Sequence, residues 1–405
     1  MRIRSITCFF NPGHGTCQKE IENLSNLANF CRKELQKIGW EVQTIRLATS
    51  PFGSFSTPET VIEKICRLED MAEKAGFNYL SVGPARLSYA QDYAIIPEIL
   101  RATENVFTSA FLAHHFKGIS RHAVRACAKI ITTAATISPD GFANLRFCAM
   151  SHVQPFTPFF PAAYSYGVRP AFSVAIECAD AALDAFHDAK TINEGKKNLQ
   201  RSLEQASREM GNVFTKAVFR FMIPFKGFDF SLAPFPEDWC SLGAALETLG
   251  LPQLGFMGSI TAAAVLAETL DQGSWKRVGF NGLMLPVLED SRLANRSAST
   301  TFSVKDLLLY STMCGTGLDT LPLPGDISAE KIEPLLMDLA ALSLRLNKPL
   351  TARLMPIPGL KAGDQTEYDF AFFKNGQVMD FPAQALQGLL DTSQWTAIRS
   401  RASFF

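Results

Sequence analysis

Short runs of β-branched and aromatic residues alternate along the chain with longer segments in which apolar residues recur at the spacing of one helix face. The short runs are typical of strands, and the recurring spacing is typical of amphipathic helices. Strands are therefore expected at 2–10, 42–47, 77–82, 106–112, 145–150, 279–287 and 350–357, and helices at 17–38, 57–76, from 120, 303–313 and 328–346. Repeated strand–helix units favour a mostly parallel sheet with helices outside it.

Two segments depart from this alternation. One long helical stretch is predicted at 179–221, and a C-terminal hairpin is predicted at 367–381, where Asn375-Gly376 would form a type I′ turn. No linker or low-complexity segment divides the chain, so residues 1–405 are expected to form a single compact α/β domain. Periodicity by itself does not distinguish an open sheet from a closed barrel.

The composition narrows the class of protein. Hydrophobic residues make up 47% of the chain, which is enough for a large core. Lys+Arg and Asp+Glu are both 39, and a nucleic-acid binder normally has a basic excess, so nucleic-acid binding is not expected. The nine cysteines form no CxxC pair, which favours free thiols in a reducing compartment. Apolar stretches are too short for a signal peptide or a membrane span, so we expect a cytoplasmic protein without a membrane partner. A homo-oligomer is compatible with all of these features.

The first unusual segment is a proline-rich aromatic loop after the strand at 145–150. It runs from 155 to 170 and contains Phe159 and Tyr164. Loops at the carboxyl ends of strands are where α/β proteins bind ligands, but this loop could equally plug the end of a barrel. His152 opens the loop and is a candidate acid/base.

The second segment is Cys314-Gly315-Thr316-Gly317-Leu318-Asp319, which continues to Asp326. Gly315 and Gly317 permit a tight turn and a close approach of the backbone to a ligand. Asp319 and Asp326 are candidates for proton transfer or for holding a cation, and Cys314 is a candidate nucleophile. In the alternative interpretation, Asp326 caps the following helix and Gly315 ends the preceding one.

The third and fourth segments carry further charges. Arg353 lies on a strand that leads into a Pro/Gly loop with Lys361 and Asp364, an arrangement typical of an anion clamp or of an ordinary surface salt bridge. Glu289 and Asp290 follow the strand at 279–287 and could bind a divalent metal, although Asp290 could instead cap the next helix. The patterns GxSxG, GxxxxGK[ST], GxGxxG and HExxH are absent, which removes the commonest motif-based assignments to enzyme classes.

The blocks 317–326 and 352–364 resemble the domain-of-unknown-function family 711, which is related to the uncharacterised UPF-0210 proteins. The likeness extends to 3–7, 158–163, 170–180 with Glu177, and 282–290. The resemblance implies a single large β/α barrel similar to the ten-stranded barrel of glycyl-radical enzymes such as pyruvate formate-lyase, with helices outside. In those enzymes a cysteine lies on a loop inside the barrel. The C-terminal Arg-Val-x-Gly-Tyr pattern that carries their radical is absent here.

These features support two functional hypotheses. In the first, the chain is an enzyme acting on a small anionic metabolite in a barrel cavity. Acid/base or thiol chemistry would come from Cys314, Asp319, Asp326 and His152, and the substrate would contact Arg353, Lys361, Asp364, Phe159, Tyr164, Gly315, Gly317 and Glu177. No cofactor is identified, and a divalent metal at Glu289 and Asp290 is compatible with the sequence. In the second hypothesis, the barrel binds or senses a metabolite without catalysis.

Overall fold

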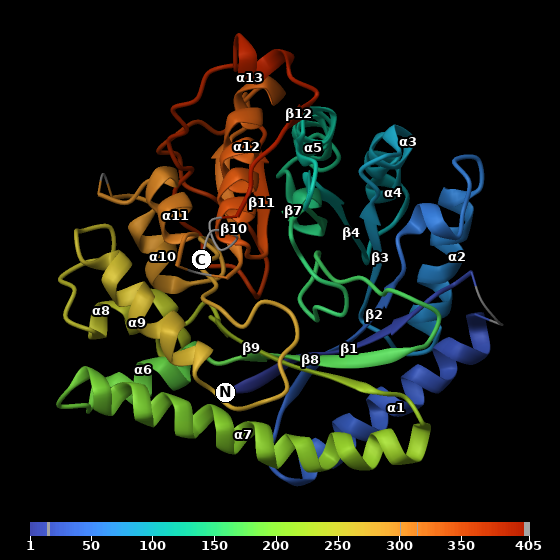
Figure 1. Cartoon of the computed structure of the whole chain (residues 1–405), viewed down its shortest axis with the longest axis vertical. Helices are drawn as coiled ribbons and strands as arrows, with labels where there is room; N and C mark the ends of the chain where they lie inside the picture. The colour runs from blue at the N-terminus through green and yellow to red at the C-terminus, as the bar shows by residue number, and fades with distance from the viewer. Residues whose placement is uncertain (14–16, 300, 314, 401–405) are drawn as a thin grey trace.

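A computed structural model describes residues 1–13, 17–299, 301–313 and 315–400. Nine strands form one large sheet: β1 (Arg2–Phe10), β2 (Val42–Thr49), β3 (Tyr79–Ala85), β4 (Val106–Phe111), β7 (Phe147–Ser151), β8 (Ala171–Glu177), β9 (Phe225–Ala233), β10 (Gly317–Pro324) and β11 (Leu350–Ile357). Figure 1 shows helices arranged around this sheet. A small second sheet joins β5 (Ala113–His114), β6 (Gly118–Ser120) and β12 (Trp395–Thr396). The α/β class expected from the sequence is confirmed.

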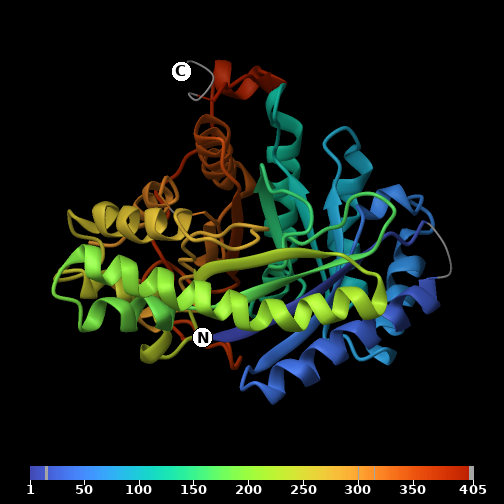
Figure 2. The ribbon, with the colours of Figure 1, turned by 60° about the horizontal axis from the view of Figure 1, so that its bottom comes forward.

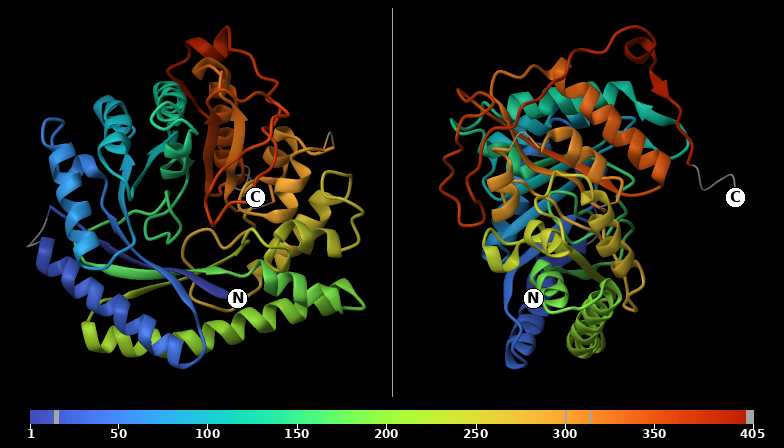
Figure 3. Two further views of the ribbon diagram at one scale, coloured as in Figure 1. Left: turned by 180° about the vertical axis from the view of Figure 1, so that it is seen from behind. Right: turned by 90° about the vertical axis from the view of Figure 1, so that its left-hand side faces the viewer.

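The helices follow most strands, as the alternating pattern predicts. They are α1 (Cys17–Lys37), α2 (Val61–Lys74), α3 (Ala90–Ala94), α4 (Ile96–Ala102), α5 (Arg121–Ala134), α6 (Ala179–His187), α7 (Ile192–Phe221), α8 (Leu242–Thr248), α9 (Ser259–Asp271), α10 (Ser291–Arg296), α11 (Val304–Tyr310), α12 (Ala329–Leu346) and α13 (Leu389–Thr392). The long helix α7 runs beside α1 and packs on β8 and β9, as Figures 2 and 3 show. Among the described residues, no helix has both the length and the apolar character needed to cross a membrane.

The large sheet consists of a central run of five parallel strands and, at each end, a pair of parallel strands that points in the opposite direction. Its order is β10-β11-β7-β4-β3-β2-β1-β8-β9. The run from β1 to β7 is parallel, as are the pairs β8–β9 and β10–β11. The antiparallel pairs β1–β8 and β11–β7 join the runs. Strands β9 and β10 are therefore the two edges, and the described pairing is a nine-stranded sheet rather than a closed barrel.

The segment 277–287, which contains the strand predicted at 279–287, contacts both edges of this sheet. It makes isolated parallel bridges from Leu283 to Leu232 on β9 and from Pro286 to Asp319 on β10. The amide of Leu232 donates to Gly282 at 2.8 Å, and the amide of Val287 donates to Asp319 at 3.1 Å. The segment is too irregular to pair along its whole length, but it spans the space between the two edges.

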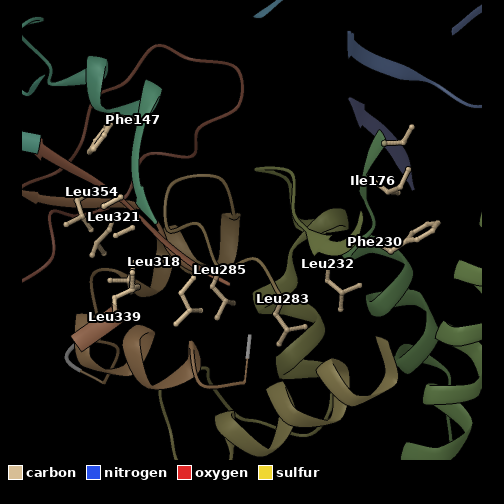
Figure 4. Close-up of a cluster of buried hydrophobic side chains, with 14 of the residues drawn as sticks. Phe147, Ile176, Phe230, Leu232, Leu283, Leu285, Leu318, Leu321, Leu339 and Leu354 are labelled. Atoms are coloured by element: carbon tan, nitrogen blue, oxygen red, sulfur yellow. The ribbon is translucent and has the colours of Figure 1, made fainter. Parts of the chain in front are cut away.

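Side chains alternate between the two faces of the sheet. In β8, Val174 and Ile176 join the main hydrophobic cluster, whereas Ser173 and Glu177 point to the opposite face. Figure 4 shows that the apolar layer continues through Phe230, Leu283 and the strands beyond them. We call this helix-covered side the outer face and the other side the inner face. Because strand side chains have a period of two, burial of the apolar set places the polar set on the inner face.

The proline-rich loop lies against the inner face. Hydroxyl groups of the strands donate to its backbone: Thr7 Oγ1 to the carbonyl of Pro158 at 2.9 Å, and Ser81 Oγ to the carbonyl of Ala163 at 2.7 Å. Ser173 Oγ donates to the carbonyl of Phe156 at 2.9 Å. A buried loop needs such partners, since its carbonyls cannot reach water. The alternation of polar residues in the strands therefore holds this loop in place.

The predicted helical stretch 179–221 is helical over most of its length, but it is divided into α6 and α7 because Thr191 caps the start of α7. The prediction of a C-terminal hairpin is wrong. The segment 367–381 contains no paired strands, and the nearest pairing is a single bridge between Gln365 and Gln377. Asn375 Oδ1 accepts from the amide of Tyr368 and closes a wide loop instead of a two-residue turn. Burial of the loop's aromatic side chains, including Phe373, outweighs the local hairpin preference.

Candidate functional site

A cavity of about 230 Å³ lies on the inner face. Each strand of the nine-stranded sheet contributes to its lining, and so does the segment 277–287 through Met284 and Pro286. The proline-rich loop covers one side with Phe159 and Phe160, and the C-terminal aromatic loop covers another with Phe372. The backbone of the proline-rich loop lies against the inner face and its aromatic side chains line the cavity, which leaves plug and ligand wall as alternative interpretations.

A chain of alternating charges crosses the cavity lining. On β11, Arg353 donates from Nε to Asp319 Oδ1 at 2.5 Å and from Nη2 to Glu289 Oε1 at 2.6 Å. Arg4 on β1 donates to the other oxygen of Glu289 at 3.2 Å and to Glu177 Oε1 at 2.5 Å. The sequence predicted Asp319, Arg353, Glu177 and Glu289 as site residues, and the structure brings all four together.

Burial shapes the ionisation of these groups. Burial raises the pKa of Asp319, and the charge of Glu289 raises it further, while Arg353 opposes both effects. For Arg353, burial alone would lower the pKa, but attraction by Asp319 and Glu289 outweighs it and raises the pKa. The arginine therefore stays charged, and Asp319 is a buried carboxyl group that gains a proton more readily than an exposed one.

Arg46 on β2 is also a buried cation, but unlike Arg4 and Arg353 it lies, within the part of the chain that the structure describes, beside aromatic rings and a hydroxyl group rather than beside a carboxylate. Its Nε donates to Thr44 Oγ1 at 2.9 Å, and its guanidinium lies over the rings of Phe160 and Tyr79, at 5.2 and 5.6 Å from their centroids. No carboxylate of the described residues forms an ion pair with it. Burial and, to a smaller extent, the charge of Arg4 together lower the pKa of Arg46 to about 9, so the side chain is still charged at neutral pH.

Arg4 and Arg46 were not among the predicted site residues. The signal was present in the sequence, since each is a charged residue in the interior of a predicted strand, at 2–10 and 42–47 respectively. In a strand buried on both faces, such a residue must face a polar partner or a ligand.

A thiol also lines the cavity, and it belongs to Cys148 on β7. Ala149 pairs with Ala352 in the antiparallel β7–β11 contact, which places Cys148 beside Arg353. Burial raises the pKa of Cys148, and Arg353 acts in the opposite direction. The predicted nucleophile Cys314 lies outside the described residues.

Related sequences identify the family of this chain. The model of the family described as "Uncharacterised ACR (DUF711)" matches residues 1–374. The chain belongs to the DUF711 family. It is similar to UPF0210 proteins from Pyrobaculum aerophilum (29% identity, 84% of this chain and 79% of the relative), Syntrophobacter fumaroxidans (28%, 87% and 82%) and Thermoanaerobacter sp. (28%, 90% and 84%). The family resemblance predicted from the sequence is confirmed, and the names of these relatives state no activity.

Several predicted site residues of this DUF711 chain lie away from the cavity. Asp326 is exposed in the turn after β10, and Lys361 and Asp364 are exposed in the turn after β11, where the Asp364 carboxylate accepts from the Lys361 amide at 2.7 Å. These turns carry the side chains beyond the strand ends, so only Arg353 of the predicted anion clamp reaches the cavity.

His152 also lies outside the cavity lining. Its Nε2 is 3.2 Å from Nδ1 of His115, and burial together with His115 lowers the pKa of His152. It follows the carboxyl end of β7, whereas Cys148 lies near the start of the strand. Tyr164 donates to the carbonyl of Val153 at 2.9 Å, which ties the proline-rich loop to itself rather than to a ligand.

The two predicted glycines serve strand packing. A Cβ atom at Gly317 would lie 2.2 Å from the carbonyl oxygen of Thr351 on β11, and one at Gly315 would lie 3.1 Å from the Cα of Gly282. The close backbone approach expected at these glycines is therefore an approach to neighbouring chain segments. Neither residue lines the cavity.

The adjacent acids Glu289 and Asp290 have separate roles. Glu289 lines the cavity and pairs with two arginines. Asp290 accepts five hydrogen bonds, from Ser241 Oγ and from backbone amides at the starts of α8 and α10. The alternative interpretation of Asp290, as a cap of the following helix, is confirmed. In the described part of the chain, no three His, Cys, Asp or Glu side chains are placed to hold a metal ion together.

Proposed function

We propose that this DUF711 chain binds a small molecule with an anionic group in the cavity, and that Arg46 holds that group. The observation that carries the proposal is a buried guanidinium without a carboxylate partner among the described residues. A buried charge is unfavourable unless it is paired, and guanidinium groups bind carboxylates with two parallel hydrogen bonds. A carboxylate ligand would supply the missing partner.

We further propose that the segment 277–287 closes the sheet into a ten-membered ring around this cavity. Its parallel bridges to Leu232 on β9 and to Asp319 on β10 support this closure. If the segment is counted as a tenth strand, five neighbouring strands point in one direction and five in the other. This arrangement is similar to the ten-stranded barrel implied by the sequence resemblance. A ligand inside such a ring would be shielded from water, which strengthens its electrostatic contacts.

The cavity also supports an enzymatic role in proton transfer. Burial raises the pKa of Asp319, which suits a group that gives and takes a proton, and Arg353 beside it would stabilise negative charge developing on the substrate. The thiol of Cys148 lies next to the same pair. Asp326 and His152 have no part in this proposal, because neither lines the cavity.

One observation favours a second candidate, a binding protein without catalysis. Glu177, Glu289 and Asp319 each accept hydrogen bonds from an arginine, so every buried carboxylate in the described lining of the cavity is in an ion pair. The two candidate functions, enzyme and binding protein, use the same ligand site and differ in whether the ligand is converted to a product. A ligand found by binding would therefore serve as the substrate in the first activity assay.

The test is a thermal melt of the full chain against a panel of small carboxylates. A ligand at about a hundred times its Kd stabilises the native state by about 2.7 kcal/mol. We expect this shift to disappear in Arg46→Gln and to persist in the control Lys361→Gln, whose side chain is exposed. Equal shifts in Arg46→Gln and in the unmodified protein would contradict the proposed role of Arg46.

A further inference from the structure

The charges around the cavity balance. Three arginines, Arg4, Arg46 and Arg353, face three carboxylates, Glu177, Glu289 and Asp319. The two remaining charged residues of the lining are of opposite sign: Glu104 is exposed, and Arg146 donates to backbone carbonyls. A ligand with a net charge would therefore leave an uncompensated charge in a buried site, which is unfavourable.

Two polar groups of the cavity are nevertheless incompletely paired. The first is the guanidinium of Arg46, which makes only the hydrogen bond from Nε to Thr44 among the described residues. The second is Asp319, whose Oδ1 accepts from Arg353 Nε and from the amide of Thr320, while Oδ2 accepts no hydrogen bond from the residues that the structure describes. One is a cation, and the other is an acceptor.

In the proposed ring, these two groups lie on opposite walls. With the segment 277–287 placed between β9 and β10, Arg46 on β2 and Asp319 on β10 are five positions apart in either direction around the ring. Both groups lie close enough to Glu289 for its charge to raise their pKa values. A ligand that satisfies both groups must therefore carry an anionic group at one end and a hydrogen-bond donor at the other.

We infer that the ligand is a small amino carboxylic acid, bound as a zwitterion with its carboxylate on Arg46 and its ammonium group on Oδ2 of Asp319. This inference rests on the proposed function. A zwitterion leaves the cavity neutral, whereas a simple carboxylate adds one negative charge. The volume of about 230 Å³ is below the range of about 300–1,000 Å³ usual for drug-sized ligands, which suits a small molecule, and Phe159 and Phe160 provide apolar surface for a short hydrocarbon chain.

The experiment compares matched probes by titration calorimetry on the full chain. The pairs are glycine and acetate, β-alanine and propionate, γ-aminobutyrate and butyrate, and δ-aminovalerate and valerate. We expect at least one amino acid to bind about tenfold or more tightly than its matched acid, as expected for one charge-assisted hydrogen bond. The comparison is made within the unmodified protein, so it does not depend on how a variant folds.

A variant then tests whether Asp319 is responsible for the preference for an amino acid over its matched acid. Asp319→Asn, with its fold checked by circular dichroism, is expected to bind both members of the pair with equal affinity. Asp326→Asn, an exposed acid beyond the end of the same strand, is expected to keep the preference. If amino acids bind no more tightly than matched acids while both depend on Arg46, the inference is wrong and the proposed function stands. If no small carboxylate depends on Arg46, the proposed function itself fails.

Discussion

The guanidinium of Arg353 on β11 donates to the carboxylate of Asp319 on the adjacent strand β10. The parallel register of these strands shifts between Leu318 and Leu321, where Thr320 has a φ of 38°. The extra residue forms a bulge, and bulges re-aim side chains locally. It directs Asp319 toward Arg353 and into the cavity.

Replacing Arg353 by methionine is expected to lower the free energy of unfolding by about 3–5 kcal/mol, because Asp319 and Glu289 would stay buried without their shared cation. Urea denaturation measures this change. Lys361→Met removes an exposed charge from the turn after the same strand and should change stability by about 0.5 kcal/mol or less. A loss below about 1 kcal/mol in Arg353→Met would show that the ion pairs contribute little.

Arg46→Met is expected to act in the opposite direction. It removes a buried charge that has no carboxylate partner among the described residues and adds apolar surface beside Phe160, so the ligand-free protein should gain about 1 kcal/mol of stability. The same variant should lose the ligand-induced shift in melting temperature. A destabilised variant that still binds carboxylates would contradict both expectations.

The stability is expected to depend on pH through Asp319. Its pKa in the folded protein lies above its ordinary value of 3.8, because of burial, so the folded state binds the proton more tightly than the unfolded state. This contribution is fully present below 3.8 and is lost as the pH rises through the folded pKa. The variant Asp319→Asn has no carboxyl group at this position and therefore lacks this pH-dependent contribution to the stability. Urea denaturation at several pH values should therefore show the stability of the unmodified protein rising relative to Asp319→Asn as the pH falls from neutral toward 4, and a flat difference would refute the assignment.

Asp290→Ala is expected to lower the free energy of unfolding by about 2–4 kcal/mol, since this carboxylate caps the starts of two helices, α8 and α10. Asp326→Ala is the matched control, because its side chain is exposed and lies outside the cavity lining. Thermal and urea denaturation of both variants measure the difference. Equal stabilities would mean that the capping hydrogen bonds are replaced by water.

Much of the fold was predictable from local pattern. The pattern of apolar and β-branched residues located six of the nine strands of the large sheet, β1, β2, β3, β4, β7 and β11, but it missed β8, β9 and β10. The helix predicted from 303 agrees with α11, where Ser303 and Asp306 form a capping box. The wide loop at 367–381 was not predictable in this way. An Asn-Gly pair favours a hairpin locally, but the structure is decided by burial of Tyr368 and Phe373 against distant residues.

By itself, the sequence determined the α/β class, the family and four of the charged residues of the cavity, because these follow from the period of side chains along a strand and from short diagnostic blocks. Only the tertiary structure decided which charges share a site. Arg4 and Glu289 are 285 positions apart, and their contact depends on the order of strands around the sheet. The turns that carry Asp326 and Lys361 away from the cavity depend on where each strand ends. Local periodicity contains neither kind of information, because both arise from the way distant segments pack around a common interior.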